Sequence, residues 1–221
     1  MLDQQTYHVI KDREQSAVAE AFRALRVNIV NALGDDRSLM FAGFCQGDGL
    51  AMTAVNTAAA LSYAGNRVVL VEGDLRTPYL QTIFGLKGSS GLTNIIHNGL
   101  TLENAVQDSY IPRLSILPSG PLPEKPVETL SHPMFRELID QLKARTDYVI
   151  FTSTPIVIVN RNILSDACVL AAKVDGVAVV ADAEAVEVNA ARKALALLKG
   201  ARARILGSVF NDVRDDQSFV Y

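Results

Sequence analysis

The sequence has few of the residues that mark secreted or metal-binding proteins. It contains two cysteines, Cys45 and Cys168, and no tryptophan. Two cysteines do not make a disulfide framework, so we expect a protein of a reducing compartment. The three histidines, His8, His97 and His132, are scattered without the spacing of metal ligands. We therefore expect no metal site.

The sequence also lacks an excess of basic charge and long apolar runs. Its net charge is −3 at pH 7, so it has no basic field of the kind that attracts nucleic acid or anionic lipid. No apolar run approaches the ~18–20 residues that a membrane-spanning helix requires. The first residues, MLDQQTYHVIKDRE, do not resemble a secretory signal. We expect a cytoplasmic protein that neither binds nucleic acid nor inserts directly into a membrane.

What the sequence does contain is an ordinary globular composition. Hydrophobic residues make up 49% and charged residues 20% of its 221 residues, which is enough to bury a sizeable core. Single α/β domains of this length are common. We expect one domain over residues 1–221, with an N-terminal arm at 1–15 and a C-terminal tail at 214–221.

Short apolar segments alternate with helical ones along the chain. The predicted strands cover residues 39–44, 67–71, 114–117, 148–151, 176–181 and 204–210, and the predicted helices 50–63, 134–145, 165–172 and 186–199. Runs such as VVLV and VAVV are typical of parallel strands covered on both faces. The alternation predicts an α/β fold with a doubly wound, mostly parallel sheet flanked by helices.

An extra helix is predicted ahead of the first strand, at residues 16–33, with Ser16 as its N-cap. Glu20, Arg23 and Arg26 recur on it every three residues. Steps of three rotate by about −60°, so the three charges share an arc of about 120°. Taken from the residues alone, this is a solvated face with one ion pair, which adds a few tenths of a kcal/mol.

The stretch FAGFCQGDGLAMT has the layout of a phosphate-binding loop. A strand leads into a glycine-containing turn and the turn into a helix, so that backbone N–H groups can surround a phosphate. Gly47 and Gly49, on either side of Asp48, supply the conformational freedom of the turn. A working loop would continue with a lysine and a serine or threonine. Leu50 and Ala51 occupy those two positions.

Both replacements remove groups that hold a nucleotide. A lysine in place of Leu50 would contact the β- and γ-phosphates, and such charge-assisted bonds contribute ~1.5–3 kcal/mol. Its loss should weaken nucleotide binding by roughly ten- to a hundredfold. A hydroxyl in place of Ala51 would hold a magnesium ion. Thr53 cannot substitute, because two residues further along a helix its side chain points to a different face.

Other motifs follow in a specific order. In VVLVEGDLRTP, Glu72, Asp74, Arg76 and Pro78 form an acid-x-acid-x-Arg-x-Pro pattern after a strand. LSILPSGPLPEKPVETL then leads from a strand through a proline-rich loop toward a helix, and Asn211 lies in GSVFNDV. In order and spacing, these motifs resemble the cytoplasmic P-loop domain of the bacterial tyrosine kinases of capsule and exopolysaccharide biosynthesis. The resemblance covers roughly residues 15–213.

The resemblance implies a P-loop NTPase-like fold and roles for individual residues. The positions matching the family's ATP or ADP site are Gly47, Asp48, Gly49, Leu50, Ala51, Asp74, Arg76 and Asn211. Family members bind Mg²⁺ with the nucleotide and autophosphorylate a C-terminal tyrosine cluster, of which this tail offers only Tyr221. They assemble into rings through a Glu-x-x-Arg-x-x-Arg helix, matched here by Glu20, Arg23 and Arg26. A homo-oligomer is implied, as is a membrane-embedded chain-length regulator or adaptor as partner.

The departures from the family pattern fall on its chemistry. Thr152 stands where the family's Walker B strand ends in an aspartate that completes magnesium positioning. In the acid-x-acid-x-Arg motif, Glu72 stands where the family has an aspartate as the first acid. Around the turn we expect Asp48, Glu72 and Asp74 to gather with Arg76 as the nearby cation, an arrangement that disfavours a polyphosphate. We expect no catalytic residue and no bound cofactor.

Several residues have a structural interpretation beside the functional one. Asp74 and Arg76 either contact a ligand or pair with each other to support the fold. Asn211 either recognises a purine or caps the final turn. Cys45 is either a reactive thiol at a helix N-terminus or a small buried residue. Tyr221 is either a phosphorylation target or simply the end of the chain.

Three functions remain open at this point. The leading hypothesis is a degenerate tyrosine-kinase relative that acts as a cytosolic scaffold or regulator of polysaccharide export, recruited by its partner to the inner face of the plasma membrane. The second is an active autophosphorylating kinase with an atypical ATP site. The third is a partition-type ATPase switch. Against it, the turn lacks the second lysine of that class and the tail is acidic.

Overall fold

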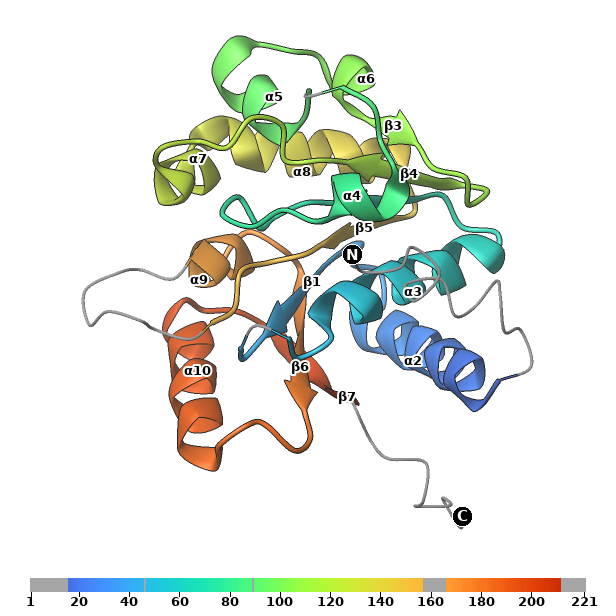
Figure 1. Ribbon diagram of the computed structural model, residues 1–221, viewed down its shortest axis with the longest axis vertical. Helices are drawn as coiled ribbons and strands as arrows, with labels where there is room; N and C mark the ends of the chain where they lie inside the picture. Colours follow the sequence, from blue (N-terminus) through green and yellow to red (C-terminus); the bar gives the residue numbers. More distant parts are fainter. Residues whose placement is uncertain (1–15, 46, 89, 157–165, 212–221) are drawn as a thin grey trace.

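The structure is a computed structural model that describes residues 16–45, 47–88, 90–156 and 166–211. Seven strands form one sheet in the order β3-β4-β2-β5-β1-β6-β7 (Figure 1). The strands are β1 (Ser38–Gly43), β2 (Val68–Val71), β3 (Gln107–Asp108), β4 (Leu114–Leu117), β5 (Tyr148–Phe151), β6 (Gly176–Asp182) and β7 (Ile205–Asn211). Neighbouring strands pair in parallel, apart from the short β3, which is antiparallel to β4.

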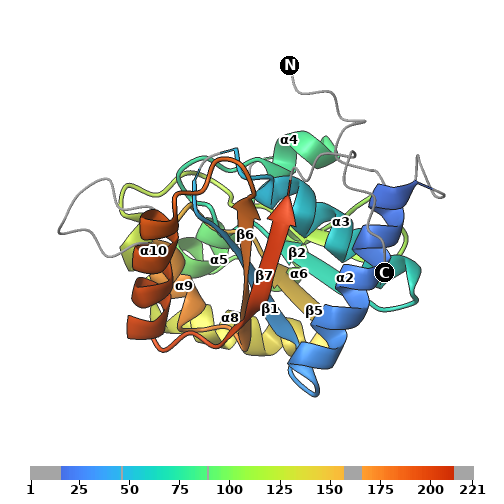
Figure 2. The same ribbon diagram turned by 90° about the horizontal axis from the view of Figure 1, so that it is seen from below.

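Helices cover both faces of the sheet. One face carries α2 (Ala17–Leu33), α3 (Leu50–Tyr63) and α4 (Leu80–Phe84). The other carries α5 (Leu92–Asn98), α6 (Leu102–Ala105), α7 (Pro126–Ser131), α8 (Pro133–Arg145), α9 (Asp166–Ala171) and α10 (Val188–Gly200). Figure 2 shows β6 and β7 between α10 on one side and α2 and α3 on the other. This is the doubly wound α/β arrangement that the alternation of segments predicted.

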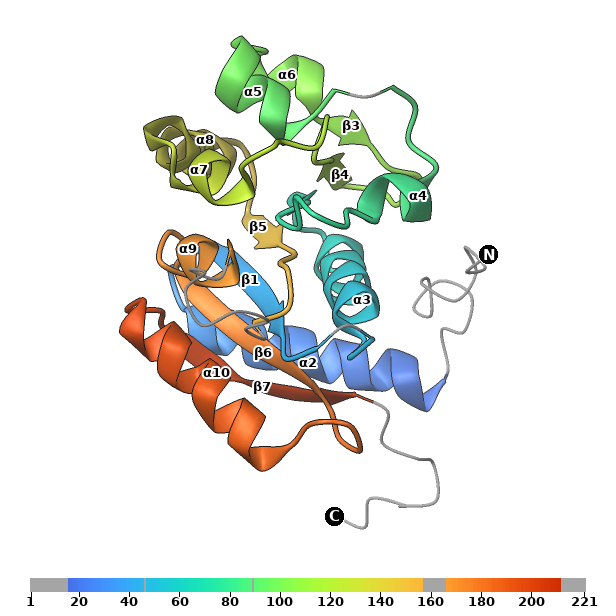
Figure 3. The ribbon, with the colours of Figure 1, turned by 60° about the vertical axis from the view of Figure 1, so that its left-hand side comes forward.

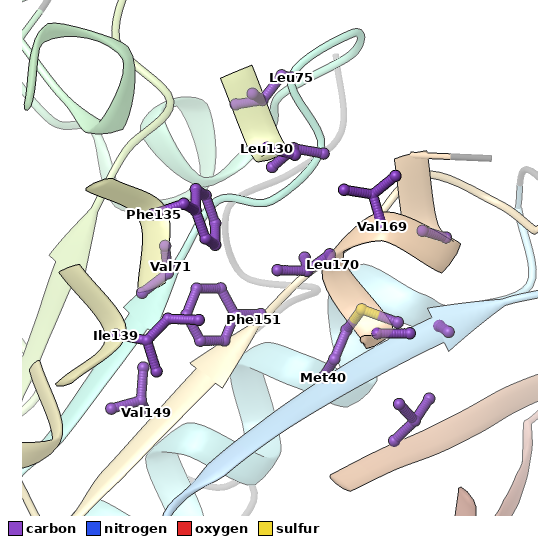
Figure 4. Close-up of a cluster of buried hydrophobic side chains, with 14 of the residues drawn as sticks. Met40, Val71, Leu75, Leu130, Phe135, Ile139, Val149, Phe151, Val169 and Leu170 are labelled. Carbon is purple, nitrogen blue, oxygen red and sulfur yellow. The ribbon is translucent and has the colours of Figure 1, made fainter. Parts of the chain in front are cut away.

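Each face of the sheet has its own apolar core. Met40 of β1 packs into the cluster beneath α5–α10, whereas its neighbour Phe41 packs into the cluster beneath α2–α4. Figure 4 shows Phe135 and Ile139 of α8 close to Phe151 of β5, and the rings of Phe135 and Phe151 lie 6.2 Å apart. Because both faces are buried, the strands need apolar residues at consecutive positions, as their sequences show.

The predicted strands and long helices are all present. The six predicted strands have ends within one residue of the observed ones, and α3 coincides with its predicted range. Ser16 caps α2 as predicted, because its Oγ accepts a hydrogen bond from the N–H of Ala19 at 3.1 Å. Gly65, expected to stop α3, has a φ of 96° and follows the last residues of that helix.

The sequence analysis missed the shortest elements. These are the two-residue β3 and the helices α4, α5, α6 and α7, of four to seven residues each. Two turns of helix are too short to display an apolar period, so pattern alone does not reveal them. The proline-rich segment contributes to them, because Pro126 occupies the first turn of α7.

The carboxyl ends of the parallel strands lie at one edge of the sheet. The later strands lie on both sides of β1, with β5 on one side and β6 on the other. Ligands of open α/β sheets bind in the crevice at this edge. Figure 3 shows α3 beginning close to the end of β1, so its N-terminus faces the same edge. Within the described ranges, no helix is long and apolar enough to cross a membrane.

Candidate functional site

A cavity of about 580 Å³ opens at the carboxyl ends of the strands. It lies where the family resemblance predicts the nucleotide, beside the turn between β1 and α3. Its walls come from this turn, from the segments after β2 and β5, and from the end of β7. The lining residues are Cys45, Gly47, Asp48, Gly49, Leu50, Ala51, Met52, Asp74, Thr77, Tyr79, Ser153, Pro155 and Asn211.

The turn has the backbone conformation that its glycines permit. Gly47 and Gly49 have φ angles of 93° and 80°, a region that other residues rarely adopt. Gly49 is also needed for space, because a Cβ built on it would lie 1.8 Å from Nδ2 of Asn211. The same amide nitrogen is 3.4 Å from the carbonyl oxygen of Asp48. Asn211 therefore lies against the turn, at the end of β7.

The Asp48 side chain is turned back into its own loop. Its Oδ1 accepts a hydrogen bond from the N–H of Leu50, and its Oδ2 accepts one from the N–H of Cys45, both at 3.2 Å. The residue is 2% exposed. Burial raises the pKa of the Asp48 carboxyl, although these hydrogen bonds oppose the rise.

Glu72 lies behind the cavity rather than in its wall. One carboxylate oxygen accepts hydrogen bonds from the N–H groups of Tyr79 and Leu80 at 2.8 Å each, where α4 begins. The other accepts one from the Thr152 hydroxyl. Burial raises the pKa of Glu72 to about 7. The expectation that Glu72 gathers in the pocket with Asp48 and Asp74 is therefore wrong, since its oxygens are engaged by the fold.

Asp74 and Arg76 do not pair through their side chains. The Asp74 carboxylate accepts hydrogen bonds from the N–H groups of Arg76 and Thr77 and from the Thr77 hydroxyl, each at 2.9 Å. The Arg76 guanidinium instead binds Asp166 of α9 at 2.7 and 3.0 Å. Asp74 lines the cavity and Arg76 does not. The expected cation at the pocket is thus directed to a neighbouring helix.

The residues present do not fit a magnesium-bound nucleotide. Leu50 and Ala51 line the cavity with apolar side chains where the family resemblance calls for a cation and a metal-holding hydroxyl. Thr152 is fully buried and uses its hydroxyl to hold Glu72 and the N–H of Gly73. Among the described residues, no group of three or more potential ligands is placed to hold a metal ion.

Cys45 is not an activated thiol. It is partly exposed at the turn, but burial of its sulfur and the charges of Asp48 and Asp182 raise the pKa of the thiol. A reactive cysteine needs the opposite, because the thiolate is the nucleophile. Burial is the main cause of the raised pKa, and the charges of Asp48 and Asp182 add to it.

The sequence analysis missed five of the residues that line the cavity, which are Met52, Thr77, Tyr79, Ser153 and Pro155. Tyr79 lines the cavity just after the acidic motif, and burial raises the pKa of its phenol well above its usual value. Ser153 lines it next to Thr152. Asp166, outside the cavity lining, binds Arg76 from α9, a helix that is distant only in the sequence. Continuing the acidic motif by one residue past Pro78 would have found Tyr79, but no sequence signal pairs Arg76 with Asp166.

The three charged residues expected to mediate assembly lie together on α2. Arg23 forms an ion pair with Glu20, whose side chain is largely exposed. Nε of Arg26 is buried and makes no hydrogen bond to the described residues. Val27 is 48% exposed, and seven residues after Glu20 it lies on the same side of the helix. Tyr221 lies outside the described residues.

Comparison with known proteins identifies the family. No protein-family model matches the chain. It is 30% identical to the putative tyrosine-protein kinase CapB of Staphylococcus aureus over 214 residues, 96% of this chain and 92% of that protein. It is 35% identical to the tyrosine-protein kinase YwqD of Bacillus subtilis (strain 168) over 199 residues, 89% of this chain and 82% of that protein.

A solved structure agrees with these sequence matches. The crystal structure of the chimerical protein CapA2B2 is similar with a TM-score of 0.87 and 27% identity, covering 95% of this chain and 91% of that one. Sequence and fold thus point to the same relatives over nearly the whole chain. The chain belongs to the family of bacterial tyrosine-protein kinases of capsule and exopolysaccharide biosynthesis.

Proposed function

We propose that this protein is a catalytically degenerate member of the family. It acts in the cytoplasm as a scaffold or regulator of capsule or exopolysaccharide export, and its ability to bind ATP is impaired. The observation that carries the proposal is the lining of the cavity. Leu50 and Ala51 stand where a lysine and a hydroxyl would hold the phosphates and magnesium, and Thr152 replaces the Walker B acid.

The contacts around the cavity support this proposal. Glu72, the first acid of the acidic motif, is bound by the fold and is not free to position a magnesium ion. Arg76 is held by Asp166 away from the cavity. Two carboxylates, Asp48 and Asp74, then line a space that a triphosphate would have to enter. The negative charges of these two carboxylates would repel a phosphate group.

The proposed scaffold role rests on features that do not need a nucleotide. Glu20, Arg23 and Arg26 retain the assembly motif of the family resemblance, and they lie on one side of α2. We infer that this side of α2 binds a second copy of the chain. The partner is a membrane-embedded chain-length regulator or adaptor, which would recruit the protein to the inner face of the plasma membrane.

Isothermal titration calorimetry of the full chain with ATP and Mg²⁺ tests the proposal. We expect no binding at micromolar nucleotide, because loss of the loop lysine alone weakens binding by roughly ten- to a hundredfold. The B. subtilis relative YwqD, measured under the same conditions, provides the positive control. Mass spectrometry after incubation with ATP and Mg²⁺ should find Tyr221 without phosphate.

The opposite result has a clear meaning. Micromolar binding of ATP together with phosphate on Tyr221 would support the alternative of an active autophosphorylating kinase with an atypical site. ATP hydrolysis without phosphotyrosine would instead support a nucleotide switch of the partition type. Either outcome would overturn the proposed scaffold role.

A further inference from the structure

The turn between β1 and α3 joins a strand to a helix, as a phosphate-binding loop does, but two N–H groups beside it already have an anionic partner. The N–H of Leu50, at the first position of α3, donates to Oδ1 of Asp48. The N–H of Cys45, on the other side of the turn, donates to Oδ2 of the same carboxylate. A carboxylate is an anion with two acceptor oxygens, which is the chemistry that such a turn attracts.

Packing holds the Asp48 carboxylate in this position. It fits because residue 43 is a glycine, since a Cβ on Gly43 would lie 2.0 Å from Oδ2 of Asp48. From the other side, the Asn211 amide contacts the Asp48 carbonyl oxygen at 3.4 Å. The side chain is also short enough to reach the N–H two residues ahead, as aspartates commonly do in turns. The carboxylate is thus packed between β1 and the turn, and with Asp48 only 2% exposed it is not a surface group.

We propose that Asp48 is an internal anion that occupies the turn and makes it reject phosphate groups. A phosphate could approach the N–H of Leu50 only by displacing a buried carboxylate of the same sign of charge. This inference rests on the proposed function, since it concerns the same cavity. It differs in its cause, because it assigns the rejection to a residue that is present rather than to the missing lysine.

Removing the charge of Asp48 tests the inference. Asp48→Asn keeps the size of the side chain and an acceptor oxygen but removes the negative charge, and Asp48→Ser also shortens the side chain. The probe is inorganic pyrophosphate without Mg²⁺, titrated calorimetrically into wild type and each variant. We expect the variants to bind pyrophosphate at least about tenfold more tightly than wild type, since each removes the like charge and frees at least one N–H of the turn for the anion. Circular dichroism melting identifies the folded variants.

Asp182 offers a matched control at the end of β6. Its charge acts on Asp48, but its own carboxylate accepts hydrogen bonds from the N–H groups of Glu184 and Ala185, outside the turn. Asp182→Asn therefore removes one negative charge near the cavity without releasing the N–H groups of the turn. We expect its gain in pyrophosphate affinity to be several times smaller than that of Asp48→Asn.

A second readout locates the bound anion. In ¹H–¹⁵N NMR spectra, pyrophosphate should shift the Leu50 amide resonance of Asp48→Asn and leave that of wild type in place. The inference would be overturned if the Asp48 and Asp182 variants gained equally in pyrophosphate affinity, or if folded Asp48 variants gained none. It would also be overturned if the affinity rose without a shift of the Leu50 amide resonance. Tight binding of ATP and Mg²⁺ by wild type would contradict the proposed function instead, and the ratio between variant and wild type would still judge the role of Asp48.

Discussion

Glu72 shows how a residue can keep its place in a motif while losing contact with the cavity. Its neighbours in the chain place it at the end of β2, where the family resemblance calls for an acid. In the folded protein its carboxylate instead receives the N–H groups of Tyr79 and Leu80 and the hydroxyl of Thr152. The replacement at position 152 and the burial of Glu72 therefore belong together. Thr152, which stands in place of the aspartate, supplies the hydroxyl that binds the Glu72 carboxylate.

The burial of Glu72 predicts how stability depends on pH. A glutamate titrates near 4.5 when unfolded, and burial raises the pKa of Glu72 to about 7 in the folded protein. The folded state therefore holds the proton more tightly, so this contribution to stability is fully present below pH 4.5 and is lost as the pH rises through 7. Glu72→Gln removes the titration. We expect the variant to be more stable than wild type at pH 8.

Urea unfolding at pH 5, 6.5 and 8 measures this difference. The free energy of unfolding of wild type should fall relative to that of Glu72→Gln across the series. Asp108→Asn, a change on the exposed edge strand β3, controls for the loss of a carboxylate elsewhere. If the wild-type and Glu72→Gln curves ran parallel, the proposed titration of Glu72 would be wrong.

Among the secondary-structure elements, Asp175 connects three that are far apart in the sequence. It lies just before β6, and its Oδ2 accepts hydrogen bonds from the N–H and hydroxyl of Ser38 in β1, at 2.9 and 2.8 Å. Lys143, near the end of α8, binds the same carboxylate at 2.6 Å. Burial alone would raise the pKa of Asp175, but the bonds from Lys143 and Ser38 lower it to about 2.

The depressed pKa of Asp175 predicts a loss of stability in acid. The contribution is present above the unfolded value of 3.8 and disappears as the pH falls toward 2. Asp175→Asn should cost about 2 kcal/mol at pH 7, by the difference between the two pKa values. Asp147→Asn, which breaks a more exposed ion pair with Arg67, should cost less than about 1 kcal/mol. Equal losses in urea unfolding would contradict the role given to Asp175.

The sequence predicted elements and residue types better than it predicted partners. The central strands were found because burial on both faces demands apolar runs, as in VVLV. The replacements Leu50, Ala51 and Thr152 were also visible, since the chemistry of a motif depends on residue type. The partner of Arg76 was not, because Asp166 lies 90 residues away. Nor was the position of Asp48, which depends on a side-chain rotamer and on the space left by Gly43.

For the molecule as a whole, the proposed assembly surface is the exposed side of α2. Arg23→Ala is expected to lower the mass of the protein measured by light scattering at two concentrations. The fold should be little affected, since the ion pair with Glu20 is exposed and such pairs add less than about 1 kcal/mol. Arg136→Ala, on exposed α8 surface across the sheet, should leave the mass unchanged. If light scattering found wild type and Arg23→Ala to be monomers alike, this interface would have no support.

The close approach of Gly49 and Asn211 has a mechanical consequence. The carbonyl oxygen of Asp48 and the amide of Asn211 belong to residues 163 positions apart, and a side chain at position 49 would clash with that amide. The turn and the end of β7 are therefore in close contact and should move together. Any ligand that pushed the turn outward would also push on the end of β7, so occupancy of the cavity would be felt at Asn211.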